Sequence, residues 1–225
     1  MIIGMLIFPD MTQLDFTGPW EVFSRFPGCE VKVISQSLQP VTAKGGLKTV
    51  PDTTMNDAPQ LDLLFVPGGQ GIVKLMEDRK VLEFLRRQAQ QAKYVTSVCT
   101  GALVLGTAGL LKGYRAATHW DSMNILPIFG ATAVSERVVT DRNRITGGGV
   151  TAGIDFALTI AADVLGVEVA KSIQLSMEYN PAPPFNCGHP SVADPAVLEE
   201  LRRKRASSQA VRLETAGRAA KMYCG

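Results

Sequence analysis

Residues 94–106 are the most informative part of the sequence: Tyr94-Val95-Thr96-Ser97-Val98-Cys99-Thr100-Gly101-Ala102-Leu103-Val104-Leu105-Gly106. Its first five residues are β-prone, and the small and leucine-rich residues after Cys99 indicate a helix. The chain therefore turns sharply from strand to helix at Cys99, as it does at the serine elbow of α/β-hydrolases. At a helix N-terminus, backbone N–H groups and the helix dipole favour a thiolate over a thiol. The alternative is that Cys99 is a small, inert residue of the core.

The rest of the chain alternates between strands and helices. Residues 2–8 form an almost continuous apolar run, which is typical of a strand that is buried on both faces of a parallel sheet. Further strands are expected at 30–35, 61–66, 131–140 and 144–146, and helices at 14–26, 81–92, 100–108, 151–165, 167–179 and 195–220. Gly18-Pro19 is expected near the start of the first helix, and a hairpin with loops between residues 37 and 60. This order predicts an α/β fold with a doubly wound, mostly parallel sheet flanked by helices, followed by a C-terminal helix.

The length of 225 residues suits one domain, and the sequence contains no internal repeat and no clear linker. We expect a single domain over residues 1–225, with a core of about 1–190 and a helical extension of about 191–225. That extension holds seven basic and four acidic side chains, a balance more typical of a solvated helix than of a ligand site.

Composition excludes several functions. The net charge is only +2, which gives no argument for binding to nucleic acid or a membrane. The four cysteines form no C-x-x-C pair and only two histidines are present, so no zinc site is expected. The first strand follows Met1 without a basic segment or cleavage site, and no apolar run reaches about 18 residues. We expect a cytoplasmic protein with reduced thiols.

Ligands of doubly wound sheets bind beyond the carboxyl ends of the strands. Asp15 follows the first strand, Gly68-Gly69-Gln70 follow the strand that ends at Val66, and Cys99-Thr100 follow the strand at 94–98. The topology therefore predicts that these three loops meet at one site.

Asp15 stands between two apolar residues, which favours a raised pKa and a role in moving protons. Its alternative role is that of a helix N-cap. Gly68 and Gly69 would let the backbone approach a ligand and offer N–H groups to developing negative charge, or they would simply form a tight turn. Thr100 is either a hydrogen-bonding partner of the substrate or a helix-terminal residue without a chemical role.

The pair His119-Trp120 supplies the supporting candidates. His119 could complete a Cys–His pair, or it could support a loop or an interface. The segment Gly147-Gly148-Gly149 lacks the Lys-Ser/Thr of a phosphate loop, so we expect close backbone packing near the site rather than a nucleotide cradle.

Taken together, these residues resemble the ThiJ/PfpI superfamily, which has the class I glutamine amidotransferase-like fold. The resemblance covers nearly the whole chain. It is carried by Phe8-Pro9-Asp10, Leu14-Asp15-Phe16-Thr17-Gly18-Pro19, Val66-Pro67-Gly68-Gly69, the Cys99 elbow, Thr118-His119-Trp120 and residues 146–155. Fewer than 40 residues follow Pro190, too few for the helix-turn-helix module that some relatives carry.

Within the superfamily the sequence is most similar to the isocyanide hydratase branch. Asp15 stands where many relatives have glutamate, Thr100 stands where the protease-like branch has histidine, and residues 174–186 resemble the same branch. The resemblance implies hydration of a small isocyanide to an N-formamide. Cys99 would be the nucleophile, Asp15 the proton carrier, Thr100 a hydrogen-bonding partner and Gly68, Gly69 and Gln70 the substrate contacts.

The resemblance also implies a homodimer that needs no cofactor. Two other classes of function stay open. One is a glyoxalase-type or hydrolytic activity, which the absence of histidine after Cys99 weakens. The other is a sensor that works through cysteine oxidation or through binding of a small ligand.

Overall fold

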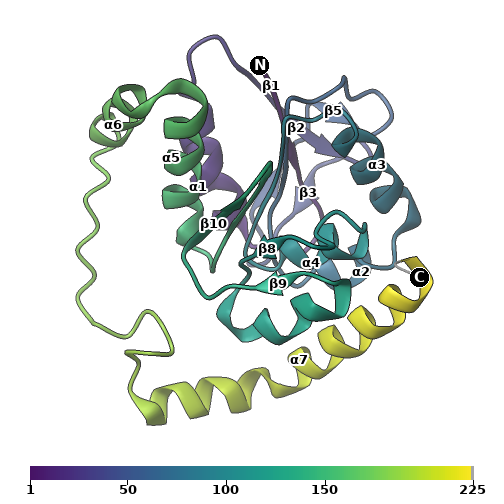
Figure 1. Ribbon diagram of the computed structural model, residues 1–225, viewed down its shortest axis with the longest axis vertical. Coiled ribbons are helices and arrows are strands. Elements are labelled where there is room, and N and C mark those ends of the chain that lie inside the picture. The colour runs from purple at the N-terminus through teal and green to yellow at the C-terminus, as the bar shows by residue number, and fades with distance from the viewer. Residues whose placement is uncertain (224–225) are drawn as a thin grey trace.

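A seven-stranded sheet forms the centre of the computed structural model, which describes residues 1–223 (Figure 1). Its strand order is β10-β11-β7-β6-β1-β2-β5, and every neighbouring pair is parallel except β10 and β11. The strands are β1 (Ile2–Leu6), β2 (Glu30–Ser35), β5 (Thr53–Thr54), β6 (Leu63–Val66), β7 (Tyr94–Val98), β10 (Val138–Asp141) and β11 (Arg144–Gly147). Two small two-stranded sheets pair β3 (Val41–Thr42) with β4 (Lys48–Thr49) and β8 (Arg115–Ala116) with β9 (Thr132–Ala133).

Helices cover both faces of the sheet (Figure 1). On one side lie α1 (Gln13–Phe23), α5 (Ala152–Leu165) and α6 (Val167–Ser176), and on the other lie α2 (Ile72–Leu75), α3 (Arg79–Ala89) and α4 (Gly101–Thr107). A 3₁₀ helix, η1 (Trp120–Phe129), packs against α4. The long helix α7 (Pro195–Tyr223) crosses η1, α4 and α2. The predicted fold class, including the C-terminal helix, is confirmed.

The central strands β1, β6 and β7 are covered on both faces. Every residue of β6 is buried, and so are the last four residues of β1 and of β7. Such strands lack the alternating pattern of a half-exposed sheet. This burial explains why continuous apolar runs located β1 and β6, whereas β7 also contains the buried polar residues Thr96 and Ser97.

Pro19 lies inside α1, although we expected it near the start of a helix. The helix continues because its small residues allow close packing against α5. A Cβ atom on Gly153 of α5 would lie 3.0 Å from Pro19 Cδ, and one on Gly18 would lie 3.2 Å from Ile154 Cγ1. Tertiary packing therefore overrides the helix-breaking tendency of Pro19.

The expected strand at 131–140 is also wrong as a single element. The chain divides there into β9 and β10, which belong to different sheets. Residues 134–137 lie between the two strands and belong to neither of them. Apolar periodicity alone does not locate such a break.

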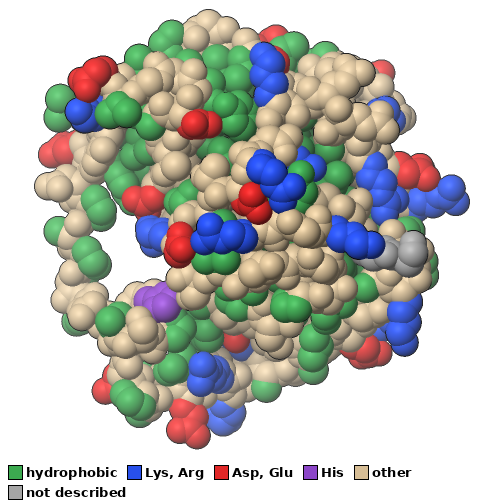
Figure 2. Space-filling model, in the orientation of Figure 1, with side chains coloured by type: hydrophobic (Ala, Val, Ile, Leu, Met, Phe, Trp, Pro, Cys, Tyr) green, Lys and Arg blue, Asp and Glu red, His purple; other side chains and the backbone are tan. Residues whose placement is uncertain are grey.

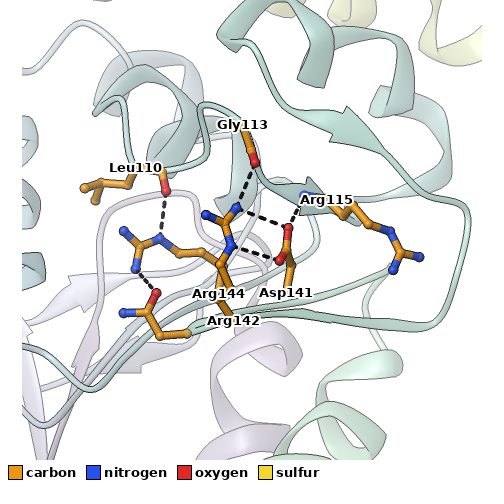
Figure 3. A network of polar contacts seen from close by, with 7 residues as sticks. Leu110, Gly113, Arg115, Asp141, Arg142 and Arg144 are labelled. Atoms are coloured by element: carbon orange, nitrogen blue, oxygen red, sulfur yellow. Dashed lines mark hydrogen bonds and ion pairs between the residues drawn. The ribbon is translucent and has the colours of Figure 1, made fainter.

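An arginine network fixes the β10–β11 hairpin to the segment after α4 (Figure 3). Arg142 donates to the carbonyl of Gly113 at 2.8 Å and to Asp141 at 3.1 Å. Arg144 donates to the carbonyl of Leu110 at 2.7 Å. Because β11 is the neighbour of β7, this network holds the strand beside the Cys99 elbow in place.

The connection between α6 and α7 runs outside the body of the protein. Residues 180–186 are exposed, and Figure 2 shows an opening between this segment and the rest of the molecule. The connection places α7 on the side of the sheet opposite α5 and α6 (Figure 1). Between residues 1 and 223, no helix is both long and apolar enough to cross a bilayer.

Candidate active site

The three predicted loops meet at the carboxyl ends of β1, β6 and β7. Asp15 lies in the first turn of α1, where its side chain is fully buried, and Thr12 rather than Asp15 is the N-cap. The N–H of Gly68 donates to Asp15 Oδ2 at 3.0 Å. Cys99 lies beside this carboxyl group, and a hydrogen bond from its thiol lowers the pKa of Asp15. The structure therefore brings Asp15, Gly68 and Cys99 together.

Cys99 has a strained backbone that aims its side chain into the site. Its φ angle is 52°, a region that residues other than glycine rarely occupy. Its N–H lies 2.8 Å from the carbonyl of Gly148 and 3.0 Å from that of Gly147, and its own carbonyl accepts from the Thr118 hydroxyl at 2.7 Å. These bonds on both sides of the residue hold the elbow. They also account for Gly147 and Gly148, whose backbone packs against Cys99 as expected.

Thr100 connects the elbow to the glycine loop. Its hydroxyl oxygen accepts from the N–H of Gly69 at 3.0 Å, and its own N–H and hydroxyl group favour the ionised form of the Cys99 sulfur. Thr100 is only 3% exposed. The Thr100 side chain thus holds the glycine loop in position and also stabilises the ionised form of the Cys99 thiol.

The N–H groups of Gly68 and Gly69 are engaged differently from our expectation. We expected them to face developing negative charge on a substrate, but one donates to Asp15 and the other to Thr100. In this structure the two glycines position the reactive side chains. Gly69 needs to be glycine, because its φ angle is 136°.

Burial raises the pKa of Asp15 to about 7, against hydrogen bonds from Cys99 and Gly68 that lower it. A carboxyl group with such a pKa exists in both protonation states near neutrality, as a general acid or base requires. The expectation of a raised pKa at Asp15 is confirmed. The second oxygen, Oδ1, is buried and accepts no N–H or O–H hydrogen bond from residues 1–223.

A backbone N–H group at the start of α4 favours the Cys99 thiolate, as expected, but this effect does not decide the pKa of the thiol. Burial raises the pKa of the Cys99 thiol well above its usual range, and the neighbouring Asp15 charge raises it further. Cys99 is only 4% exposed, and α4 has only seven residues, so desolvation outweighs its N–H groups. Ionisation of Cys99 therefore depends on transfer of its proton to a partner, and Asp15 is the adjacent group.

His119 is not placed as the partner of Cys99. Its Nδ1 accepts from the N–H of Asp121 at 3.2 Å, which caps η1, and its Nε2 lies 3.5 Å from Arg205. Burial and the charge of Arg205 lower the pKa of His119 to about 4. A neutral His119 thus supports the pocket wall, the alternative that the sequence left open. Trp120 lies outside the Cys99 pocket, under the Arg205 guanidinium at 5.9 Å.

A cavity of about 370 Å³ opens in front of Cys99. Gly69, Gln70, Cys99, Thr100 and His119 line one side of it, whereas Gly68, which we also expected to contact the substrate, does not line it. The opposite wall comes from α7, which contributes Lys204, Arg205, Ser208, Gln209 and Arg212. The sequence missed this wall, because we interpreted the basic tail as a solvated helix. A run of cations was the only signal, and such runs usually face solvent.

Within the described residues, no group of three or more His, Cys, Asp or Glu side chains could hold a metal ion. Cys29, Cys99 and Cys187 are free thiols, and Cys224 lies outside the described residues. The chemistry available here consists of one buried thiol, one buried carboxyl group and the cations of α7.

The fold and site define an α/β protein with a cysteine at a strand-to-helix elbow and a buried carboxyl group beside it. Residues 1–163 match the model of the DJ-1/PfpI family. The chain belongs to this family.

Named relatives support the narrower resemblance as well. The chain is 53% identical to the isonitrile hydratase of Pseudomonas putida over 97% of its own length and 96% of the relative's. A crystal structure of a ThiJ/PfpI family protein from Pseudomonas syringae matches 96% of this chain and 90% of that one, with a TM-score of 0.94 and 42% identity. The transcriptional regulator GbdR of Pseudomonas aeruginosa is 32% identical, but it matches over only 50% of its own length. The predicted resemblance to isocyanide hydratases is therefore confirmed.

Proposed function

We propose that this protein is an isocyanide hydratase, a lyase that converts an isocyanide and water to the N-substituted formamide. The observation that carries the proposal is the buried pair of Asp15 and Cys99. Sequence similarity to an isonitrile hydratase over nearly the whole of both chains supports the proposal. The cavity in front of Cys99 is suited to a small organic molecule.

The first step joins the thiol to the isocyanide carbon. Asp15, as a carboxylate, accepts the thiol proton and then delivers it to the terminal carbon of R–N≡C. The Cys99 sulfur forms a bond to the same carbon, which gives the thioimidate R–N=CH–S–Cys99. Atoms and charge balance, because the thiol has added across the carbon and no group has left.

The second step adds water. Asp15 accepts a proton from water as the oxygen bonds to the thioimidate carbon and passes that proton to the nitrogen, giving R–NH–CH(OH)–S–Cys99 and leaving Asp15 as a carboxylate. Collapse of this adduct breaks the C–S bond, returns a proton to sulfur and releases R–NH–CHO. A carboxyl group with a pKa of about 7 suits both directions of proton transfer.

The direct test measures formamide formation from p-nitrophenyl isocyanide by ultraviolet absorbance. Wild-type protein should turn the compound over, and Cys99→Ala should abolish turnover. Intact-mass spectra after brief exposure should contain an adduct of isocyanide mass on wild-type protein, mapped to Cys99. Full turnover by Cys99→Ala would refute the nucleophile, and the lack of turnover by wild-type protein would refute the proposed function.

Side-by-side assays separate this proposal from the other two classes. Turnover of methylglyoxal or a peptide, with none of isocyanide, would favour a glyoxalase-type or hydrolytic enzyme. Reversible oxidation of Cys99 without any turnover would favour a sensor. The burial of Cys99 and the raised pKa of its thiol argue against the sensor, because peroxide reacts with accessible thiolates.

A further inference from the structure

We propose that the substrate is an isocyanide whose organic group carries a carboxylate, and that Arg212 and Arg205 of α7 bind this anion. The inference rests on the proposed function and names its substrate class. It comes from the cations that face Cys99 across the cavity.

Arg212 is a buried guanidinium group with a hydrogen-bond donor to spare. It is 7% exposed and lines the cavity. One terminal nitrogen donates to Ser122 Oγ at 2.9 Å and to Gln209 Oε1 at 3.0 Å. Its Nε is buried and has no hydrogen-bond partner among residues 1–223. Both of its partners are neutral, so the cation is anchored without being neutralised.

A buried cation without a close ion-pair partner is costly, and proteins seldom keep one without a use. Burial lowers the pKa of Arg212, and the charges of Cys99 and Asp121 only partly oppose this effect. A carboxylate in the cavity would supply the close partner that Asp121 does not. A guanidinium group binds a carboxylate well because its donors match the two oxygens.

Arg205 is the second cation at this wall and is more accessible. Its side chain is 40% exposed, and its terminal nitrogen lies 3.8 Å from Asp121 Oδ2. That distance is too long for a hydrogen bond. The Arg205 guanidinium also lies over the Trp120 ring, which limits its motion, and one of its terminal nitrogens lies 3.5 Å from His119 Nε2.

The balance of charge around the cavity is positive. Lys44, Lys204, Arg205 and Arg212 line it, and Asp121 is the one carboxylate among the lining residues. Lys204 also contacts Glu200 at 3.2 Å, outside the cavity. Asp15 is not among the lining residues, and its Oδ2 accepts from the N–H of Gly68. A cleft lined by one sign of charge concentrates ligands of the opposite sign.

Arg212 could instead act only by stabilising the Cys99 thiolate, because the two charges interact. The two roles predict different results. Stabilisation of the thiolate would affect every isocyanide alike, whereas carboxylate recognition affects only substrates that carry the anion. A matched acid and ester therefore separate them.

The first experiment measures kcat/KM for 4-isocyanobenzoate and for its methyl ester. We expect wild-type protein to prefer the acid by about tenfold or more, mainly through a lower KM, and Arg205→Met to remove most of that preference. The matched control is Arg203→Met, which removes an exposed arginine from the same helix outside the cavity and should keep the preference. Arg212→Lys should raise KM for the acid by a larger factor than KM for the ester.

The outcomes distinguish this inference from the proposed function. Hydration of the ester with no preference for the acid would overturn the inference alone. If neither compound is hydrated, the proposed function fails and the substrate class fails with it. Equal losses of both substrates in Arg205→Met and Arg212→Lys would assign the arginines to the thiolate and overturn carboxylate recognition.

A second experiment needs no turnover. Iodoacetate and iodoacetamide alkylate the same thiol, but only iodoacetate carries a carboxylate. The rate of Cys99 alkylation by iodoacetate, divided by the rate by iodoacetamide, should be about tenfold higher in wild-type protein than in Arg205→Met. This ratio should fall as the salt concentration is raised. The Arg203→Met control should keep the wild-type ratio. Equal ratios in wild-type protein and Arg205→Met would overturn the inference, even if Arg212→Lys fails to fold.

Discussion

Gly68 holds Asp15 through a backbone hydrogen bond of 3.0 Å between residues 53 positions apart in the sequence. The same glycine fills the narrow space between the two reactive side chains. A Cβ atom there would lie 2.7 Å from Asp15 Oδ2 and 2.8 Å from Cys99 Cβ. The missing side chain at Gly68 thus allows a thiol and a carboxyl group to lie together in the core.

Gly68→Ala should therefore disrupt the pair. The new methyl group would force Asp15 and Cys99 apart, and we expect kcat/KM to fall by about 100-fold, because small displacements of reacting groups are costly. Overpacking should also lower the free energy of unfolding by about 1–3 kcal/mol. Steady-state kinetics and urea unfolding check both effects. Gly188→Ala, where an added Cβ meets nothing within 4 Å, is the control and should retain activity.

The pKa of Asp15 predicts how activity depends on pH. Because Asp15 must accept the thiol proton as a carboxylate, kcat/KM should rise with pH and level off above about 7. Asp15→Asn should lower kcat/KM by about 100-fold or more and remove this rise. Measuring kcat/KM between pH 5 and pH 9 for wild-type protein and Asp15→Asn tests both expectations. An unchanged rise in the Asn variant would assign the titration to another group.

Stability should change with pH in the opposite direction. The pKa of Asp15 is raised from 3.8 to about 7 by folding, so the folded state binds the proton more tightly. Its contribution is therefore complete below about pH 4 and is lost as the pH rises to 7, by about 2–3 kcal/mol between pH 5 and 7. Urea unfolding at pH 5 and pH 7 measures the free energy of unfolding of wild-type protein and of Asp15→Asn. The value for wild-type protein minus that for the variant should fall between the two pH values by about 2–3 kcal/mol. A difference that does not depend on pH would contradict the raised pKa.

Local patterns in the sequence located two strands to the residue. The strands expected at 30–35 and 94–98 agree with β2 and β7 at both ends. Pro19 was misplaced because its helix is held by contact with Gly153, which lies far away in the sequence. The break within residues 131–140 was missed because the first half pairs with β8 and the second half with β11, and the local sequence does not indicate these partners.

The residues of the site also fall into those that the sequence predicted and those that it did not. Asp15, Gly68 and Cys99 could be predicted because each follows a strand of one parallel sheet, and parallel strands bring their carboxyl ends together. Arg205 and Arg212 could not, because α7 reaches the cavity only after an exposed connection that no periodicity describes. The pKa of the Cys99 thiol also required the structure, since burial and helix dipole act in opposite directions and only their balance decides.

Thr100 offers a test of what its hydroxyl group contributes. Thr100→Val keeps the shape but leaves the N–H of Gly69 without its acceptor, which should cost about 1–3 kcal/mol of stability. Loss of the hydroxyl should also raise the pKa of Cys99 further and lower kcat/KM about tenfold. Thr100→Ser keeps the hydroxyl and is the matched control. The rate of Cys99 alkylation as a function of pH reports the thiol directly, and equal profiles for Val and Ser variants would exclude this role.

His119 should contribute through structure rather than through proton transfer. Its Nδ1 caps η1, and its pKa of about 4 keeps it neutral over the working range. His119→Ala should lower the free energy of unfolding by about 1 kcal/mol, and His119→Asn should restore part of it, because asparagine also caps a helix. Both variants should keep the rise in kcat/KM near pH 7, since we assign that rise to Asp15. Loss of the rise in both variants, together with its survival in Asp15→Asn, would make His119 the base and reverse the assignment.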